Sequence, residues 1–212
     1  MTEILQPFLL SLIAGSATGI GGLVVLVFGR VSDRIMGFLI GFAGGVMLIV
    51  SFLDLFIEAL AILSYLEVTL AFAVGALFMM AIDLALPHME LGRWERGVVD
   101  SRLFKTGLVI AIGITLHNLP EGLVVSAGYA HIPKLGLLIA ITICLHNIPE
   151  GIATATPLTL AGVGKLRASA LAFLSGLTEP IGALIGATVL STLGGRELGA
   201  CPRRWCYDLH HG

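Results

Sequence analysis

Two copies of one six-residue pattern, HNLPEG at 117–122 and HNIPEG at 146–151, lie within long apolar runs of the sequence. Ionisable side chains are costly inside a bilayer, where they usually mark an ion or proton path. With about 100° between successive residues of a helix, His117 and Glu121 lie on one face, and Asn118 lies roughly 60° from Glu121. The first copy therefore brings together one imidazole, one amide oxygen and one carboxylate.

The second copy gives the same arrangement to His146, Asn147 and Glu150. A short connector at about 130–135 predicts two antiparallel helices, and at 1.5 Å per residue both motifs lie roughly 20–24 Å from the same membrane face. The two copies should therefore face each other at a similar depth. Their nitrogen and oxygen ligands suit a borderline divalent cation such as Zn²⁺, Fe²⁺, Mn²⁺ or Co²⁺.

Each copy also contains a proline followed by a carboxylate and a glycine. Proline lacks an N–H, so Pro120 and Pro149 should kink their helices and free a carbonyl oxygen one turn earlier. Such an oxygen is tolerated at membrane depth where it lines a cavity. Gly122 and Gly151 remove a side chain just past the kink, which lets another helix or a passing ion come close.

The composition excludes a soluble globular protein, because 57% of the 212 residues are hydrophobic and only 12% are charged, whereas the charged share is typically about a quarter. The net charge of −2 gives no indication of a nucleic-acid partner, and we expect none. We predict an all-α polytopic bundle in a lipid bilayer. Its six apolar stretches of spanning length are Pro7–Phe28, Ile35–Leu60, Leu66–Leu86, Leu103–Tyr129, Leu135–Leu160 and Leu166–Leu193.

The basic residues predict the orientation, because cytoplasmic loops carry an excess of Lys and Arg. With an extracytoplasmic N-terminus, only Lys134 falls on the outer side before residue 194. The inner loops then hold Arg30, Arg34, Arg93, Arg96, Arg102, Lys105, Lys165 and Arg167.

The second apolar stretch carries two further patterns. Gly37, Gly41 and Gly45 recur every four residues, a spacing that predicts close packing by a neighbouring helix. Asp54 and Glu58 share one face near the end of the same stretch. These acids either reach the membrane interface or contribute to the movement of metal into or out of the protein.

The doubled His-Asn-x-Pro-Glu-Gly motif resembles the fourth and fifth helices of the ZIP family (zinc-regulated, iron-regulated transporter-like proteins) of divalent metal transporters. The resemblance covers about residues 7–193 and includes Glu179, in the string LTEPIG of the sixth stretch. It implies two adjacent metal positions that share the carboxylates of Glu121 and Glu150. The first would use His117, Glu121, His146 and Glu150, and the second Asn118, Glu121, Asn147, Glu150 and Glu179.

The resemblance also implies the activity. We expect a carrier in the cell membrane that moves a divalent metal toward the cytoplasm by alternating exposure of a midplane site. Zn²⁺ is the first choice of cargo, with Fe²⁺, Mn²⁺, Co²⁺ and Cd²⁺ as further ones. No cofactor is expected, and the family suggests a homodimer.

The C-terminal segment departs from the family pattern. The family has eight helices, whereas the resemblance here ends after six, so we expect a ZIP-like domain at 1–193 and an atypical tail at 194–212, from a truncated or altered C-terminus. The tail contains Cys201, Cys206, His210 and His211, which could bind zinc but follow no recognisable pattern.

Three other interpretations have to be weighed against a carrier. Lone polar residues in membrane helices often serve packing, but two His, three Glu and two Asn at comparable depth argue against a purely structural role. An intramembrane metalloenzyme would use a motif such as His-Glu-x-x-His or Glu-x-x-His, and neither occurs here. We therefore expect no enzymatic activity. A non-transporting metal-binding or regulatory form remains the main alternative.

Overall fold

The computed structural model of the protein describes residues 2–29, 31–85 and 100–194. The described residues are helical apart from short connections and form no strand, which confirms the all-α prediction. The predicted tail at 194–212 lies outside this part, except for Gly194 at the end of the last helix. The helices are α1 (Thr2–Phe28), α2 (Asp33–Ile49), the π-helix η1 (Val50–Leu55), α3 (Phe56–Leu60), α4 (Tyr65–Ala85), α5 (Ser101–His131), α6 (Pro133–Leu160), α7 (Lys165–Gly176) and α8 (Thr178–Gly194).

These helices form six segments long and apolar enough to cross a membrane, as predicted. Helices α2, η1 and α3 make up the second segment, and α7 and α8 make up the sixth. Helix α5 begins where the Asp100 carboxylate accepts a hydrogen bond from the Leu103 N–H at 3.0 Å, a typical N-cap. Only Ile132 separates α5 from α6. This connector is shorter than predicted, and it makes α5 and α6 antiparallel neighbours.

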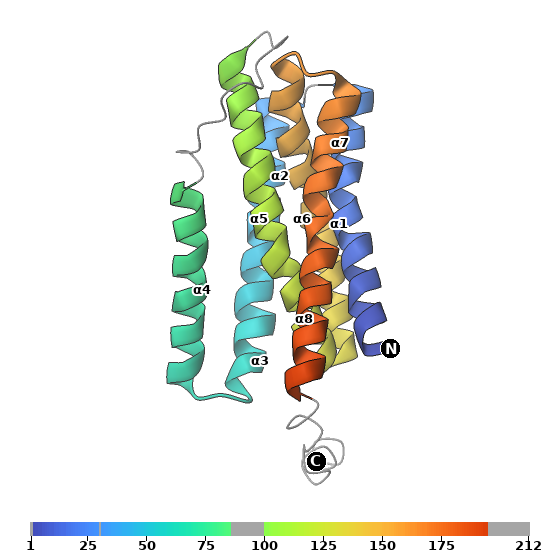
Figure 1. Ribbon diagram of the computed structural model, residues 1–212. Helices are drawn as coiled ribbons and strands as arrows, with labels where there is room; N and C mark the ends of the chain where they lie inside the picture. Colours follow the sequence, from blue (N-terminus) through green and yellow to red (C-terminus); the bar gives the residue numbers. More distant parts are fainter. Residues whose placement is uncertain (1, 30, 86–99, 195–212) are drawn as a thin grey trace.

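Helices α1, α5, α6 and the α7–α8 segment form the tightly packed part of the bundle, whereas α4 lies at its edge (Figure 1). Half of the most apolar 18-residue stretch is buried in each of the α1, α6 and α7–α8 segments. In the α2–α3 and α4 segments, only 6% of that stretch is buried. The Phe72 ring of α4 packs against Phe52 and Phe56, with ring centroids 5.3 and 5.9 Å apart. The protein interior that could hold a polar site is therefore built by α1, α5, α6, α7 and α8.

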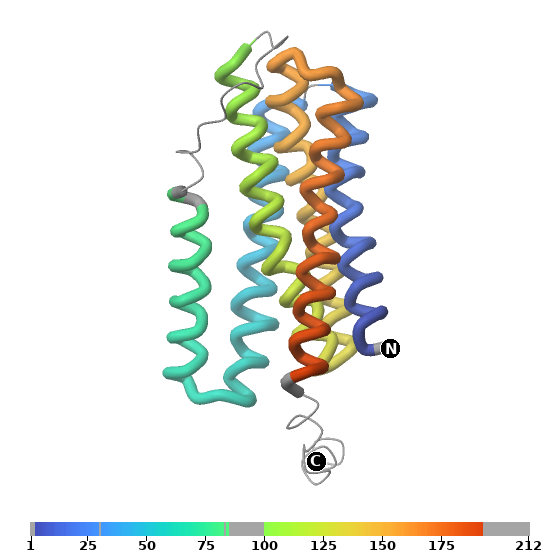
Figure 2. The backbone as a smooth tube through the Cα atoms, in the orientation of Figure 1, coloured from blue at the N-terminus to red at the C-terminus, as the bar shows by residue number. Residues whose placement is uncertain are grey.

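Successive segments run in alternating directions, as the tube in Figure 2 shows. One end of the bundle holds the α1–α2 and α6–α7 connections and the start of α5, and the other end holds the α3–α4 and α5–α6 connections. The described basic residues sort between these ends as the sequence predicts. Arg34, Arg102, Lys105, Lys165 and Arg167 belong to the first end, called the basic end below, and Lys134 belongs to the opposite end.

The predicted close approach at Gly37, Gly41 and Gly45 is wrong for the described part of the chain. A β-carbon added at any of these glycines would meet no atom within 4 Å. By contrast, Gly122 lies against the backbone of Glu179, and Gly151 lies against the carbonyl of Thr18. The close helix contacts predicted for the glycines of the two motifs are therefore confirmed. Close contacts between helix backbones therefore occur at the two polar motifs and not at the glycines of the second segment.

One polar contact joins the second segment to α5. The His131 Nε2 lies 2.8 Å from the Glu58 Oε1, and both side chains are 38% exposed. Glu58 therefore has a partner at the end of the bundle opposite the basic end. Exposed pairs of this kind contribute about 0–1 kcal/mol to the free energy of unfolding, so this contact stabilises the fold only slightly.

Candidate metal centre

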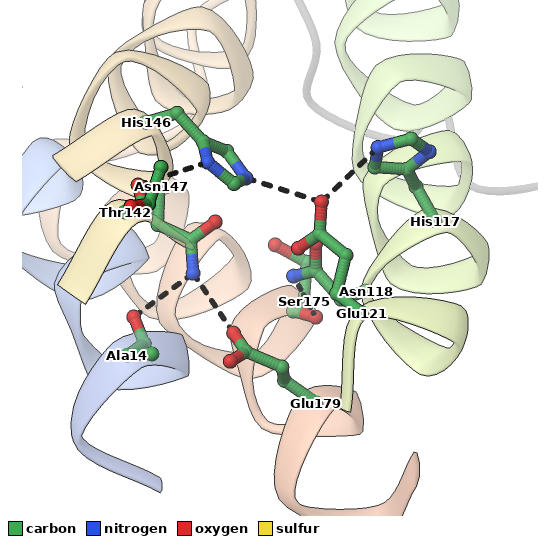
Figure 3. Close-up of polar contacts among 9 residues, drawn as sticks. All are labelled: Ala14, His117, Asn118, Glu121, Thr142, His146, Asn147, Ser175 and Glu179. Atoms are coloured by element: carbon green, nitrogen blue, oxygen red, sulfur yellow. Dashed lines mark hydrogen bonds and ion pairs between the residues drawn. The ribbon is translucent and has the colours of Figure 1, made fainter. Parts of the chain in front are cut away.

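The Glu121 carboxylate on α5 is the centre of the polar cluster (Figure 3). Its Oε1 lies 3.2 Å from the His117 Nε2 and 3.1 Å from the His146 Nε2. Glu121 and His146 are buried, whereas the His117 side chain is 38% exposed. The two imidazoles thus reach one carboxylate oxygen from different helices, which confirms that the two motifs meet at the same depth.

The contacts of the His146 ring nitrogens suit metal binding. Its Nδ1 lies 3.2 Å from the Thr142 carbonyl oxygen, which can only accept a hydrogen bond (Figure 3). With a metal ion bound, a neutral imidazole that donates from Nδ1 would present the lone pair of Nε2, the nitrogen that faces Glu121, to the ion. Histidines that bind metals are commonly oriented in this way by a backbone carbonyl.

Glu150 on α6 completes a group with His117 and Glu121. Each of the three offers one ligand atom, and these atoms all lie within 4.8 Å of one another. Two ligands of one zinc ion, each about 2.0–2.2 Å from it, lie at most roughly 4.4 Å apart. A small movement of the side chains would therefore allow all three to bind one ion.

The two asparagines present their amide groups in fixed orientations (Figure 3). Asn147 Nδ2 donates hydrogen bonds to the Ala14 carbonyl and to Glu179 Oε2, both at 2.9 Å. Asn118 Nδ2 donates to the Ser175 carbonyl at 3.1 Å. Because the amide nitrogens are occupied in this way, each Oδ1 is left as an acceptor. The sequence could not identify the Ala14 and Ser175 carbonyls, since a backbone group leaves no mark in the residue pattern.

Several buried oxygens of this cluster have no hydrogen-bond partner within the described part of the chain. A buried polar atom without a partner costs about 1–3 kcal/mol, and lipid offers no water to satisfy it. Five such atoms in one place form an oxygen-rich cluster that a cation would satisfy. They are Asn118 Oδ1, Glu121 Oε2, Asn147 Oδ1, Glu150 Oε2 and Glu179 Oε1.

The sixth segment differs from the continuous helix predicted at 166–193. It is interrupted at Leu177, between α7 and α8. Pro180 lacks the N–H that would bond the Gly176 carbonyl, and that carbonyl lies against Gly15 of α1. The interruption puts the fully buried Glu179 in the first turn of α8, where it meets Asn147. By contrast, α5 and α6 continue through Pro120 and Pro149.

All seven predicted ligands thus lie on α5, α6 and α8 around one buried region. The structure joins His117, Glu121, His146 and Glu150 on one side, and Asn147 with Glu179 on the other. Asn118 donates its hydrogen bond to a group outside this set, the Ser175 carbonyl. The first group has the members of the first metal position expected from the sequence, and the second group contains two of the five residues expected at the second position.

Comparison with known proteins agrees with this chemistry. The family model for the ZIP zinc transporters matches residues 93–200. A zinc transporter ZupT of Chlorobium phaeovibrioides is 41% identical over 206 residues, covering 90% of this chain and 77% of that protein. Zinc transporter ZTP29 of Arabidopsis thaliana is 38% identical over 202 residues, covering 88% of this chain and 73% of that protein. No solved structure matches the chain significantly.

Proposed function

The chain belongs to the ZIP family of zinc transporters, and on that premise we propose that it carries Zn²⁺ across a membrane through buried ligands on α5, α6 and α8. The carboxylate of Glu121, with an imidazole nitrogen on either side of one oxygen, is the observation that carries this proposal. The relatives are named as transporters and not as enzymes, in agreement with the expected absence of enzymatic activity.

The proposed site has two adjacent metal positions. His117, Glu121, His146 and Glu150 hold the first ion, and Asn118, Asn147 and Glu179 hold the second together with the shared Glu121 and Glu150. The buried oxygens without partners support this assignment, because a divalent cation satisfies several of them at once. The shared carboxylates of Glu121 and Glu150 match the charge of the first Zn²⁺, and Glu179 offsets part of the charge of the second, which lowers the cost of burying the ions.

The proposed direction of transport is toward the cytoplasm, and the N-terminus lies on the extracytoplasmic side. The sorting of the described basic residues to one end of the bundle supports this orientation. Location in the cell membrane, a homodimeric state and transport of Fe²⁺, Mn²⁺, Co²⁺ and Cd²⁺ stay predictions from the sequence.

Zinc uptake into sealed vesicles that contain the purified chain tests this function. We expect saturable uptake, measured with a zinc-sensitive dye inside the vesicles, that is absent from empty vesicles. Tight zinc binding without any uptake would instead favour the non-transporting metal-binding alternative.

The His146 imidazole should contribute to selectivity. Replacing it by a carboxylate, in His146→Asp, exchanges a nitrogen ligand for an oxygen ligand, and nitrogen ligands favour Zn²⁺ more than Mn²⁺. We expect the variant to lose zinc affinity by about 10- to 100-fold and manganese affinity by clearly less. Competition between the two metals for the purified protein measures this difference. Equal losses for both would show that His146 does not bind the ion.

A further inference from the structure

Several buried hydroxyl groups on α1 and α6 have no hydrogen-bond partner among the residues that the structure describes: Ser11, Thr18, Thr154 and Thr156. They are exceptions in this protein, because a hydroxyl in a helix commonly donates to the carbonyl four residues earlier. Hydroxyls that do so are those of Ser16, Thr69, Thr106, Thr115, Thr142, Thr159, Thr188 and Thr192. Thr18 and Thr154 are also fully buried, so their hydroxyls point into the protein interior without satisfying the backbone.

Thr154 lies one helical turn from a metal ligand, and Thr18 lies one turn from the Ala14 carbonyl that orients Asn147. Thr154 follows Glu150 by four residues on α6, or about 6 Å. Thr18 follows Ala14, whose carbonyl accepts from Asn147, by four residues on α1. Both helices run toward the basic end of the bundle. Thr154 is thus displaced from Glu150 toward that end, whereas Thr18, whose carbonyl lies against Gly151, is level with the end of the second motif.

The surroundings of the two residues are close-packed. The Thr18 Oγ1 faces Gly176 of α7, since a β-carbon there would lie 2.7 Å from it. Farther along toward the basic end, an apolar cluster that includes Val25, Phe104 and Leu158 fills the core. Thr18 and Thr154 therefore lie at the border between the carboxylates and this cluster, whose members Ile152 and Ala155 flank Thr154 in the sequence.

An ion that leaves its carboxylates has to regain oxygen contacts, and hydroxyl groups can supply them through the water molecules that the ion carries. We propose that Thr18 and Thr154 hydrogen-bond the hydration water of a divalent metal ion as it leaves the site toward the basic end. This inference rests on the proposed transport function. It gives a reason for threonine at two buried positions where the hydroxyl has no protein partner in the described helices and where valine would fill the same space.

Valine substitutions test the role of the hydroxyls, because Thr18→Val and Thr154→Val keep the shape and remove only the polar group. We expect each to lower the maximal rate of zinc uptake roughly two- to tenfold, as the loss of one hydrogen bond to the hydrated ion predicts. Zinc affinity of the purified protein should be unchanged. The thermal midpoint of unfolding should stay the same or rise, since no hydrogen bond within the protein is lost.

Thr159→Val is the matched control, because the Thr159 hydroxyl on the same helix donates to the Ala155 carbonyl at 2.8 Å. It should leave the maximal rate near that of the unmodified chain. Wild-type rates in both Thr18→Val and Thr154→Val, or losses no larger than in Thr159→Val, would overturn the inference.

Thiol labelling separates this inference from the transport function. In a chain with Cys144, Cys201 and Cys206 replaced by serine, Thr18→Cys and Thr154→Cys should react with a small water-soluble methanethiosulfonate. We expect rates at least about tenfold higher than for Ala155→Cys, a fully buried neighbour. Absence of uptake by the unmodified chain would overturn the proposed function. If uptake were normal but the thiols of Thr18→Cys and Thr154→Cys were as unreactive as that of Ala155→Cys, the proposed role of Thr18 and Thr154 would be overturned while the transport function stood.

Discussion

Glu121→Gln is expected to abolish zinc uptake, because Glu121 is the carboxylate that both imidazoles approach. The variant keeps the shape of the side chain but removes the negative charge that offsets the charge of the ion. Hydrogen bonds and ligand contacts of charged groups are about twice as strong as neutral ones. We therefore expect zinc affinity to fall by at least about 100-fold, with transport below detection in the vesicle assay.

Glu67→Gln provides the control for this experiment. Glu67 is an exposed glutamate in the first turn of α4, where its carboxylate accepts from the Ser64 hydroxyl at 2.7 Å. Uptake by this variant should match that of the unmodified chain. A folded and inserted Glu121→Gln protein that still transports zinc at a normal rate would contradict the proposed site.

Gly122→Ala is expected to cause a large loss of stability. A β-carbon at this position would collide with the Glu179 carbonyl and lie 2.6 Å from the Ala183 nitrogen. Both are backbone atoms of α8, which cannot move aside as a side chain could. We expect a loss of about 1–3 kcal/mol or more and a lower thermal midpoint in detergent. Uptake should also fall, because separating α5 from α8 moves Glu179 away from Glu121.

Gly41→Ala is the matched control, since a β-carbon at Gly41 would meet nothing within 4 Å. Alanine is a better helix former than glycine by up to about 1 kcal/mol, so this variant should be as stable as the unmodified chain or slightly more stable. If Gly41→Ala were the more damaging of the two, the packing of α5 against α8 described above would be wrong.

The spans and the candidate ligands could be predicted because both depend on local features of the sequence. An apolar run of spanning length specifies a membrane helix, and the spacing of His117 and Glu121 places both on one face of it. The short α5–α6 connector then brings His146 to the same depth. No long-range information was needed for these steps.

Other features depend on contacts between distant segments, which a single sequence does not reveal. The stripe at Gly37 and Gly41 has the right spacing for close packing, but its partner is specified elsewhere, and here no described segment approaches it. Pro180 marks the sixth stretch in the sequence, but the position of the interruption at Leu177 is accompanied by contacts with α1 that the sequence does not reveal. The roles of the Ala14 and Ser175 carbonyls likewise follow from packing alone.

X-ray absorption at the zinc edge tests the central claim most directly, using the purified full chain loaded with zinc. The proposed site predicts a first shell of nitrogen and oxygen at about 2.0–2.2 Å, with imidazole scattering that weakens in His146→Asp. Zinc bound through sulfur at about 2.3 Å would place the metal on the cysteines, such as Cys201 and Cys206. That result, or a spectrum unchanged in both His146→Asp and Glu121→Gln, would contradict a metal site on α5, α6 and α8.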